Sequence, residues 1–482
     1  MFSRMCTHLR SDGLWRVVAV VMGVALVARL AFFFYFFVHG GEAALLPGDG
    51  LRYLSLADST LSGHGYMYEG ALEAYRAPGY PLYFMLFRLL HAPLWSASLL
   101  QTTVSAGIAG WVVWFSRIKL GLPVWAACIA GLFAALEPDQ VYYSVMLLPD
   151  VFFSIATLAT FTYVLRWFDT GLFRYVFYAG LAIGIGNYFR PALMYLPFFL
   201  AVAFFFFAYA WWRPSVERGS TQASTPNVNR GSVKHAAIAT LLVIVTAFGV
   251  MAPWYMRNEY VFGAFGFVSS QGYTQFTYDA VATTAAVEHR TYQDVKVEML
   301  AQASAQAPDP NLYSFADGKY LTDQTLAVVI AHPKDFLKVY FLGLSEFWTI
   351  GNYQYLLKSV GLLAPPSQSV SYTMLLASQG LHAAISSFIG KIFEPFILVA
   401  LFDRTFWFCI CLIALTGLVL YRREPAAWLA LLFALYFSAT ILSVSIGVEA
   451  RHRYALDPLL FAFTVAALHI LYARFRDKKS GA

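Results

Sequence analysis

The sequence predicts an all-α polytopic membrane protein with about 10–13 transmembrane helices, whose functional residues lie on the extracytoplasmic loops. Three observations lead to this fold class. Of the 482 residues, 59% are hydrophobic and only 12% are charged, whereas soluble domains carry about 25% charged residues. Apolar runs long enough to cross a bilayer recur along the chain. Basic residues collect in every second connection between these runs.

The apolar runs give the number of transmembrane helices. A membrane-spanning helix needs ~20 predominantly apolar residues. Ten segments qualify: 15–38, 97–116, 122–137, 150–166, 174–190, 192–212, 235–255, 392–420, 425–446 and 454–473. Two shorter apolar stretches, 81–95 and 336–350, are interfacial or re-entrant candidates. The total therefore lies between about ten and thirteen.

The basic residues predict the orientation. Cytoplasmic connections carry an excess of Lys and Arg. With the N-terminus inside, every inner segment is basic: Arg4, Arg10 and Arg16; Arg117 and Lys119; Arg166 and Arg174; Arg213, Arg218, Arg230 and Lys234; Arg422 and Arg423; and Arg474, Arg476, Lys478 and Lys479. Both termini are thus expected in the cytoplasm. The net charge of +6 includes no basic stretch interleaved with aromatic residues, so no nucleic acid partner is expected.

The chain divides into three parts. These are an N-terminal transmembrane module, 1–255, with a first loop at 39–96 and a cytoplasmic linker at 213–234; an extracytoplasmic module, 256–391; and C-terminal transmembrane helices with a basic tail, 392–482. Ser, Thr, Asn and Pro dominate the linker. The extracytoplasmic module has helical patterns at Tyr292–Gln306 and Leu321–Leu344, and we expect it to fold against the membrane.

Ionisable and aromatic residues collect on the outer face of this topology. They are Asp49, Arg52, Tyr53, His64, Glu69, Glu73 and Arg76 in the first loop; Glu137, Asp139 and Asp150 in the second; Arg190; Arg257 and Asn258; and Glu449, Arg451, His452, Arg453, Tyr454 and Asp457 in the last. Inner turns offer cations and little else. This asymmetry predicts a functional site outside, and Asp49, between two glycines and one helical turn from Arg52 and Tyr53, is its strongest candidate.

Several of these residues also have a purely structural interpretation. Asp150 follows Pro149 at a helix start, where an acidic group favours the helix dipole. Arg190 is a candidate interface anchor, and Glu449 with Arg451 or Arg453 is a candidate structural ion pair. Arg29 lies inside the first span, where a cation is costly. Its partner is expected to be either a carboxylate or a lipid phosphate.

Several short motifs in the outer loops, taken in order, resemble the glycosyltransferase C superfamily. The motifs are Asp49-x-x-Arg52-Tyr53; Arg76-x-Pro78-Gly79-Tyr80-Pro81; Glu137-Pro138 with Pro149-Asp150; Arg190-Pro191; Pro253-Trp254-x-x-Arg257-Asn258; and Glu449-x-Arg451-x-Arg453-Tyr454. The chain looks most similar to the bacterial branch related to dolichyl-phosphate-mannose–protein mannosyltransferases and lipid A aminoarabinose transferases. Many members of this superfamily have a second acidic residue directly after the first-loop aspartate, where this chain has Gly50.

The resemblance implies an inverting membrane glycosyltransferase in the bacterial cytoplasmic (inner) membrane. Such an enzyme moves a sugar from a polyprenyl-phosphate donor to a lipid, glycan or protein acceptor on the outer, periplasmic face. By resemblance, Asp49 is the base that takes the acceptor's proton, and Asp150 is a second catalytic residue. Partial desolvation would raise the basicity of Asp49, while Arg52 would oppose this and hold the carboxylate ionised.

The other roles also follow from the resemblance. Arg52, Arg76, Arg257 and Arg453 are expected to bind the donor phosphate by charge-assisted hydrogen bonds. Tyr53 and Tyr80 are expected to contact the sugar, and Glu137, Arg190 and Glu449 complete the predicted substrate site. No cofactor is assigned with certainty. A divalent metal ion is a candidate cofactor, because Asp49, Glu137, Asp139 and Asp150 offer hard oxygen ligands.

Two other functions compete with this interpretation. A transporter or flippase of lipid-linked saccharides would share the helices and the outer cations, but it needs polar groups along a path to the inner side. In this sequence such groups stop near one face. A transferase of the O-antigen ligase type uses a diphosphate-linked donor, and the first-loop aspartate argues against it. The sequence does not identify the sugar or the acceptor.

Overall fold

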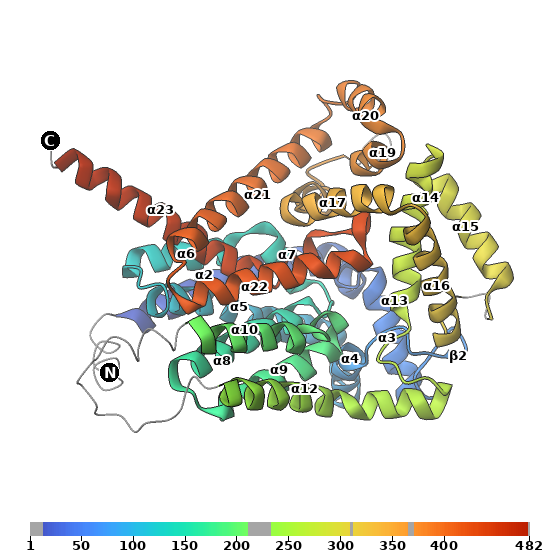
Figure 1. Cartoon of the computed structure of the whole chain (residues 1–482), viewed down its shortest axis with the longest axis horizontal. Helices are drawn as coiled ribbons and strands as arrows, with labels where there is room; N and C mark the ends of the chain where they lie inside the picture. Colours follow the sequence, from blue (N-terminus) through green and yellow to red (C-terminus); the bar gives the residue numbers. More distant parts are fainter. Residues whose placement is uncertain (1–12, 211–232, 309–311, 365–370, 481–482) are drawn as a thin grey trace.

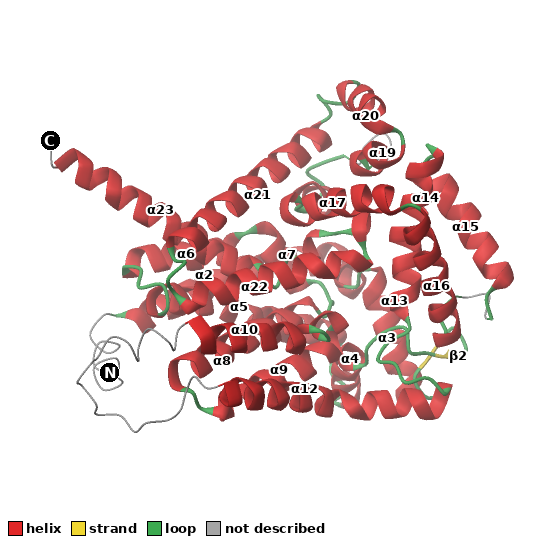
Figure 2. Cartoon of the chain, viewed as in Figure 1, coloured by secondary structure: helices red, strands yellow, loops and turns green. Residues whose placement is uncertain are grey.

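The computed structural model describes residues 13–210, 233–308, 312–364 and 371–480. Helices make up nearly all of these residues (Figure 2), and the predicted all-α polytopic fold is confirmed. A short antiparallel hairpin, β1 (Met67–Tyr68) with β2 (Ala71–Leu72), lies within the first loop. Most of the predicted linker 213–234 falls outside the described residues.

Eight helices in the described part of the chain are long and apolar enough to cross a membrane. They are α2 (Leu14–Gly40), α5 (Leu94–Ile118), α8 (Asp150–Thr170), α10 (Leu196–Ala210), α12 (Val233–Phe262), α21 (Pro395–Leu420), α22 (Pro425–Thr440) and α23 (Asp457–Ser480). The apolar segments at α10 and α22 run from Pro191 to Ala208 and from Pro425 to Ser443, because the turns beside these helices extend them. The two remaining predicted spans, 122–137 and 174–190, correspond to α6 (Val124–Leu136) and α9 (Phe173–Phe189), which are not among the eight. All ten predicted spans are therefore helices, and eight have full spanning length.

The connections between the long helices are themselves mostly helical. The remaining helices are α3 (Gly48–Leu61), α4 (Gly79–Leu89), α7 (Pro138–Val145), α13 (Ser270–Gln275), α14 (Val281–Glu288), α15 (Tyr292–Gln306), α16 (Phe315–Ala331), α17 (Pro333–Thr349), α18 (Tyr353–Ser359), α19 (Tyr372–Ser378) and α20 (Gly380–Ile389). Single turns join them: η1 (Gly41–Leu45), η2 (Pro191–Leu193), the π-helical η3 (Phe276–Ala280), η4 (Ile441–Ser443), η5 (Ser445–Gly447) and η6 (Ala450–His452).

The helical pattern predicted at Tyr292–Gln306 is α15, but the pattern at Leu321–Leu344 is two helices instead of one. The chain breaks at His332, and Pro333 is the first residue of α17. Proline has no backbone N–H and its ring clashes with the preceding turn of a helix, so it is accommodated only in the first turn. The apolar residues before and after the break follow a helical periodicity, so the sequence pattern alone indicated one continuous helix.

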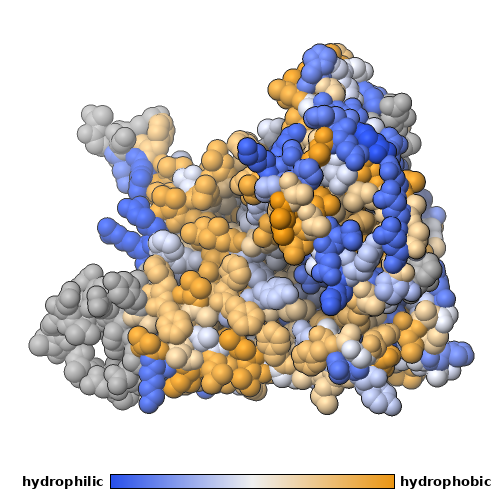
Figure 3. Space-filling model, turned by 45° about the vertical axis from the view of Figure 1, so that its right-hand side comes forward, coloured by the Kyte–Doolittle hydropathy of each residue, from blue (hydrophilic) through white to orange (hydrophobic). Residues whose placement is uncertain are grey.

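The two ends of the helical bundle differ in character (Figure 1). At one end, the Tyr421 hydroxyl after α21 donates to the Leu120 carbonyl after α5. We call this the basic end, because Arg16, Arg117, Arg166 and Arg174 lie near the ends of the helices that meet there and Arg422 follows α21. At the other end, the Ser269 backbone N–H before α13 donates to the Ala74 carbonyl of the first loop at 3.0 Å. In Figure 3, hydrophilic side chains gather mainly on the right-hand side of the molecule, and hydrophobic ones dominate the left.

Arg29 has neither of its two predicted partners. Its guanidinium is fully buried and donates to the carbonyls of Ala134 and Ala135, at 3.2 and 2.8 Å, and to Ala25 in its own helix. The last four carbonyls of a helix have no partner within the helix, and α6 ends at Leu136. Arg29 therefore satisfies the C-terminal carbonyls of α6, which explains a cation within the first span without a carboxylate or a lipid.

Candidate functional site

A cavity of about 640 Å³ lies at the end of the bundle opposite the basic end. Three chemically distinct walls enclose it. One is ionic: Asp49, Arg76, Asp150, Arg190, Glu449, Arg451 and His452. One is apolar, including Phe189, Ala192, Met194, Tyr195, Phe199, Tyr436, Leu442 and Val444. The third comes from the segment that follows α12: Ser270, Gln271, Tyr273, Thr274, Gln275 and Tyr278. Tyr53 and Tyr75 also line the cavity.

Asp49 is the centre of the ionic wall. It lies in the first turn of α3, directly after Pro47 and Gly48. Arg76 Nη2 is 2.6 Å from its Oδ1, and Arg451 Nη1 is 2.8 Å from its Oδ2. The three side chains are about one-quarter exposed, at 25%, 27% and 24%. Each oxygen of one carboxylate is thus held by a different arginine, and these two arginines are 375 positions apart in the sequence.

Close backbone contacts hold these loops in place. A Cβ on Gly79, the first residue of α4, would lie 2.6 Å from the Tyr188 carbonyl oxygen of α9. Only glycine lets α4 approach so closely, and this contact brings the Arg76 segment to the end of α9. The Glu73 carboxylate accepts a hydrogen bond from the Arg76 backbone N–H at 3.2 Å, which fixes the preceding turn.

A second ion pair continues the ionic wall. Arg190, at the C-terminus of α9, donates to Asp150, the first residue of α8, and also to the Arg451 carbonyl at 3.1 Å. The Asp150 side chain is 1% exposed. Arg451 Nε lies 2.8 Å from Glu449 Oε2. Acidic and basic groups therefore alternate along this wall from Arg76 to Arg190.

These charges set the protonation of the wall. Burial alone would raise the pKa of Asp49, but the adjacent charges of Arg76 and Arg451 outweigh it, and the pKa lies below its usual value. Arg451 and Arg76, instead of Arg52, thus keep Asp49 ionised, which corrects the sequence-based assignment. Burial, with the charges of Arg190 and Arg451, lowers the pKa of His452 well below its usual value. The His452 ring is therefore neutral at pH 7, and its Nδ1 accepts the Glu449 backbone N–H at 2.9 Å.

Gly50 explains why a second acidic residue is missing beside Asp49. A Cβ at this position would lie 2.9 Å from the Leu147 carbonyl oxygen and 3.2 Å from Leu46 Cδ2. The Leu147 backbone N–H in turn donates to the Leu45 carbonyl at 2.8 Å. The start of α3 is thus pressed against the second loop, and there is no room for a side chain at position 50. Asp49 is the single acidic residue at the start of α3.

Arg52 and Arg257 do not line the cavity. Arg52 pairs with Glu73 at 3.1 Å, and the rings of Tyr68, Tyr75 and Tyr313 surround its guanidinium at 4.4–4.7 Å. Arg257 donates to the Glu73 carbonyl at 2.9 Å and lies 4.8 Å from the Trp254 ring centroid. Both arginines hold the first loop against neighbouring elements, and the cavity that contains Asp49 is formed without them.

Three more predicted substrate residues lie away from the cavity. Arg453 is fully buried, donates to the carbonyls of Phe347 and Ile350, and pairs with Asp457 at 2.9 Å. It caps the C-terminal end of α17. The Tyr80 hydroxyl donates to Gln101 at 2.7 Å in the core. Glu137 accepts the Gln140 backbone N–H at the start of α7 and the Tyr353 hydroxyl.

The cavity thus contains six of the eleven residues that the sequence singled out. They are Asp49, Tyr53, Arg76, Asp150, Arg190 and Glu449. Arg451 was recognised as an outer-face residue but received no role, and His452 and the α13 residues Gln271 and Gln275 also line the cavity. The alternation Glu449-x-Arg451-x-Arg453 signals two cations in this loop. It does not reveal which of them turns into the cavity.

The four carboxylates considered as metal ligands do not form one cluster. Asp49 and Asp150 line the cavity and are paired with arginines. Asp139 accepts the Asn352 backbone N–H at 3.2 Å, next to Glu137, outside the cavity lining. Within the described ranges, no group of three or more His, Cys, Asp or Glu side chains is placed to hold a metal ion.

Comparison of the chain with protein-family models, with curated proteins and with solved structures found no match. The function is therefore inferred from the residues of the cavity and from the resemblance of the loop motifs to a known superfamily.

The ionic wall predicts a pH-dependent contribution to stability. Because the pKa of Asp49 is lowered in the folded protein, its pairing stabilises the fold above the unfolded pKa of about 3.9 and is lost as the pH falls through the folded value. Asp49→Asn should lower the unfolding free energy in detergent at pH 7 by roughly 2 kcal/mol, because it leaves two arginines without their charged partner. The apparent Tm should fall accordingly. The difference from wild type should shrink below about pH 4.

The matched control is Asp58→Asn. Asp58 pairs with Arg88 on the surface, where the two side chains are 47% and 42% exposed, and such pairs contribute about 0–1 kcal/mol. Thermal unfolding between pH 3 and pH 7 compares the two variants. Equal destabilisation by both substitutions at pH 7 would contradict a special contribution from Asp49.

Proposed function

We propose that the protein is an inverting membrane glycosyltransferase that uses a polyprenyl-phosphate sugar donor. The acceptor is a lipid, glycan or protein on the outer face of the bacterial cytoplasmic membrane. One observation carries the proposal: the ionised Asp49 carboxylate is held by two arginines, Arg76 and Arg451, in a cavity that has an apolar wall at the ends of two membrane-spanning helices. This arrangement suits a substrate with a charged phosphate, a polar sugar and an apolar tail.

The walls of the cavity correspond to the parts of such a donor. Arg76, Arg190 and Arg451 supply guanidinium groups for the phosphate. The apolar wall includes Tyr195 and Leu442, from the ends of α10 and α22, which are 53% and 46% exposed. In this proposal the first isoprene units lie there, with the remaining tail in lipid. The amides and hydroxyls of α13 face the same cavity and offer hydrogen bonds to a sugar or an acceptor.

The proposed step is an in-line displacement at the anomeric carbon. The acceptor oxygen attacks from the side opposite the phosphate, the bond between the anomeric carbon and the phosphate oxygen breaks, and the electron pair leaves with the phosphate. The acceptor proton passes to Asp49. The negative charge that grows on the leaving phosphate is stabilised by arginines already held in place by the ionic wall.

Donor binding would also make Asp49 a better base. In the ligand-free ionic wall, Arg76 and Arg451 lower the pKa of Asp49 and so weaken it as a proton acceptor. A phosphate that binds these guanidinium groups competes with the Asp49 carboxylate for them. The pKa of Asp49 then rises when the donor is present, which couples proton acceptance to an occupied site.

The orientation of the protein is part of the same proposal. The described cations Arg16, Arg117, Arg166, Arg174 and Arg422 belong to the basic end, opposite the cavity. The positive-inside tendency assigns that end to the cytoplasm. The cavity then opens on the side where nucleotide sugars are absent and lipid-linked sugars are the available donors.

The central test uses a deletion strain and mass spectrometry of its lipid A, glycans and surface proteins. We expect one sugar to be absent from one acceptor class, to return with the wild-type gene or with Asp58→Asn, and to stay absent with Asp49→Asn at equal protein level. Restoration by Asp49→Asn would refute its role as the base. Purified protein that labels the acceptor in detergent, where no membrane barrier exists, would exclude a flippase.

A second prediction separates arginines that line the cavity from arginines that brace the fold. Arg451→Gln and Arg76→Gln should reduce sugar transfer at least about 100-fold, the usual effect of removing a charge-stabilising donor. Arg453→Gln should instead lower the amount of folded protein, because it leaves the carbonyls of Phe347 and Ile350 without their donor. The assay is transfer per mole of folded protein, measured after size-exclusion chromatography. Normal transfer by Arg451→Gln would remove it from the proposed site.

A further inference from the structure

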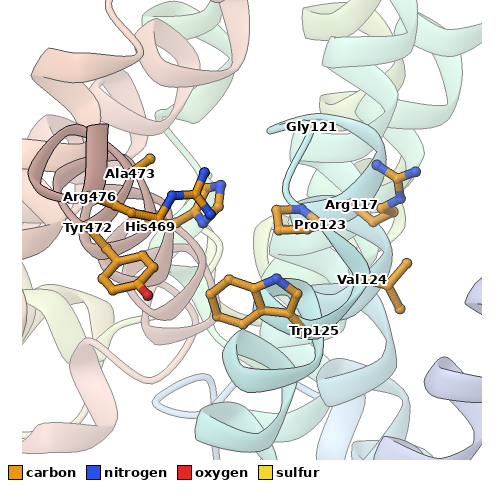
Figure 4. A pocket seen from close by; sticks show the side chains of 9 residues that line it. All are labelled: Arg117, Gly121, Pro123, Val124, Trp125, His469, Tyr472, Ala473 and Arg476. Atoms are coloured by element: carbon orange, nitrogen blue, oxygen red, sulfur yellow. The ribbon is translucent and has the colours of Figure 1, made fainter. Parts of the chain in front are cut away.

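A second cavity, of about 700 Å³, lies at the basic end, far along the helices from Asp49 (Figure 4). Two elements distant in sequence form it. One face of α23 contributes His469, Tyr472, Ala473 and Arg476. The end of α5, the turn after it and the start of α6 contribute Arg117, Gly121, Pro123, Val124 and Trp125. Figure 4 shows His469 and Arg476 extending from α23 toward this turn. The proposed sugar transfer uses none of these residues.

The turn that forms one wall is held rigidly. Gly121 has a φ of +67°, in the left-handed region that favours glycine. The Tyr421 hydroxyl donates to the Leu120 carbonyl at 2.9 Å, and Arg117 donates to the Leu122 carbonyl at 3.2 Å. The backbone before α6 is therefore fixed from both sides, so the wall is formed before any ligand binds.

The cavity is suited to an anion. Its lining contains Arg117 and Arg476 and no acidic side chain. The nearest acidic group on α23, Asp477, lies 3.8 Å from Arg476 Nε, and both side chains are at least 70% exposed. The N-terminus of α6 points its backbone N–H groups to this side without a side-chain cap, and such termini favour phosphate groups. The Nδ1 atom of His469 is buried and has no hydrogen-bond partner among the described residues.

The cavity also has an apolar, lipid-facing rim. Trp125 and Tyr472 are 54% and 59% exposed, and the Trp125 ring contacts His469 edge-on at 5.5 Å between centroids. Tryptophan and tyrosine at the end of a membrane-spanning helix occupy the headgroup level of a bilayer. A soluble phosphate would make no use of these rings, whereas the glycerol and upper acyl chains of a lipid would lie against them.

We propose that this cavity binds the phosphate headgroup of an anionic phospholipid from the leaflet at the basic end. The phosphate lies between Arg476 and the first turn of α6, and the acyl chains pass over Trp125 and Tyr472. Basic pockets between membrane helices are the usual form of such sites. This inference does not depend on the proposed glycosyl transfer.

Native mass spectrometry of the full-length protein in detergent tests the site, with phosphatidylglycerol and phosphatidylcholine as probes. We expect wild type to retain phosphatidylglycerol preferentially. Arg476→Gln should weaken that retention about tenfold, the loss expected for one charge-assisted hydrogen bond. Arg474→Gln is the matched control, because it removes the same charge from the same helix but does not line the cavity. It should stay within about twofold of wild type.

Three outcomes would overturn the assignment. Equal retention of the two lipids by wild type would exclude an anionic site. Equal losses in Arg474→Gln and Arg476→Gln would mean general attraction to the basic helix end. Displacement of phosphatidylglycerol by millimolar inorganic phosphate, with no effect of Trp125→Ala, would mean that the cavity recognises a free phosphate and not a lipid.

Discussion

The pairing of Asp49 with both Arg76 and Arg451 is the interaction on which the cavity end of this protein depends. It joins the start of α3, the loop before α4 and the loop before α23 around a single carboxylate. Arg190 extends the connection to α8 and α9 through Asp150 and the Arg451 carbonyl. Segments from three loops that are far apart in the sequence thus meet in one wall. A substrate that engages these arginines would alter the protonation of Asp49 and the contacts between the loops together.

Arginine has two distinct tasks in this fold. Arg29 and Arg453 satisfy carbonyls near the ends of α6 and α17, deep in the protein, where water is not available to do so. Arg76, Arg190 and Arg451 line a cavity and hold carboxylates that are within reach of a ligand. Arg29 and Arg453 are fully buried and therefore out of reach of a phosphate, whereas Arg76 and Arg451 are paired with a partly exposed carboxylate and can exchange that partner.

The sequence was sufficient for the fold class and for a connection after the first span that contains Asp49, but it did not predict that this connection is helical from Gly48. It was insufficient wherever the answer depended on which way a side chain turns. Arg451 and Arg453 are two residues apart in a 3-10 turn, and only one faces the cavity. The partner of Arg29 is the end of a helix about 105 residues away, which no local pattern predicts. Gly50 occupies the position where many superfamily members have a second acidic residue. The close Leu147 carbonyl leaves no room there for a side chain.

The most direct test of the proposed donor site is the position of the phosphate in a cryo-electron microscopy structure of the purified protein with polyprenyl phosphate. The proposal predicts a phosphate within hydrogen-bond distance of Arg451 and of Arg76 or Arg190. It also predicts that the first isoprene units lie against Tyr195 and Leu442, and that Asp49 has lost at least one arginine partner. A phosphate bound elsewhere, with both ion pairs of Asp49 intact, would contradict it.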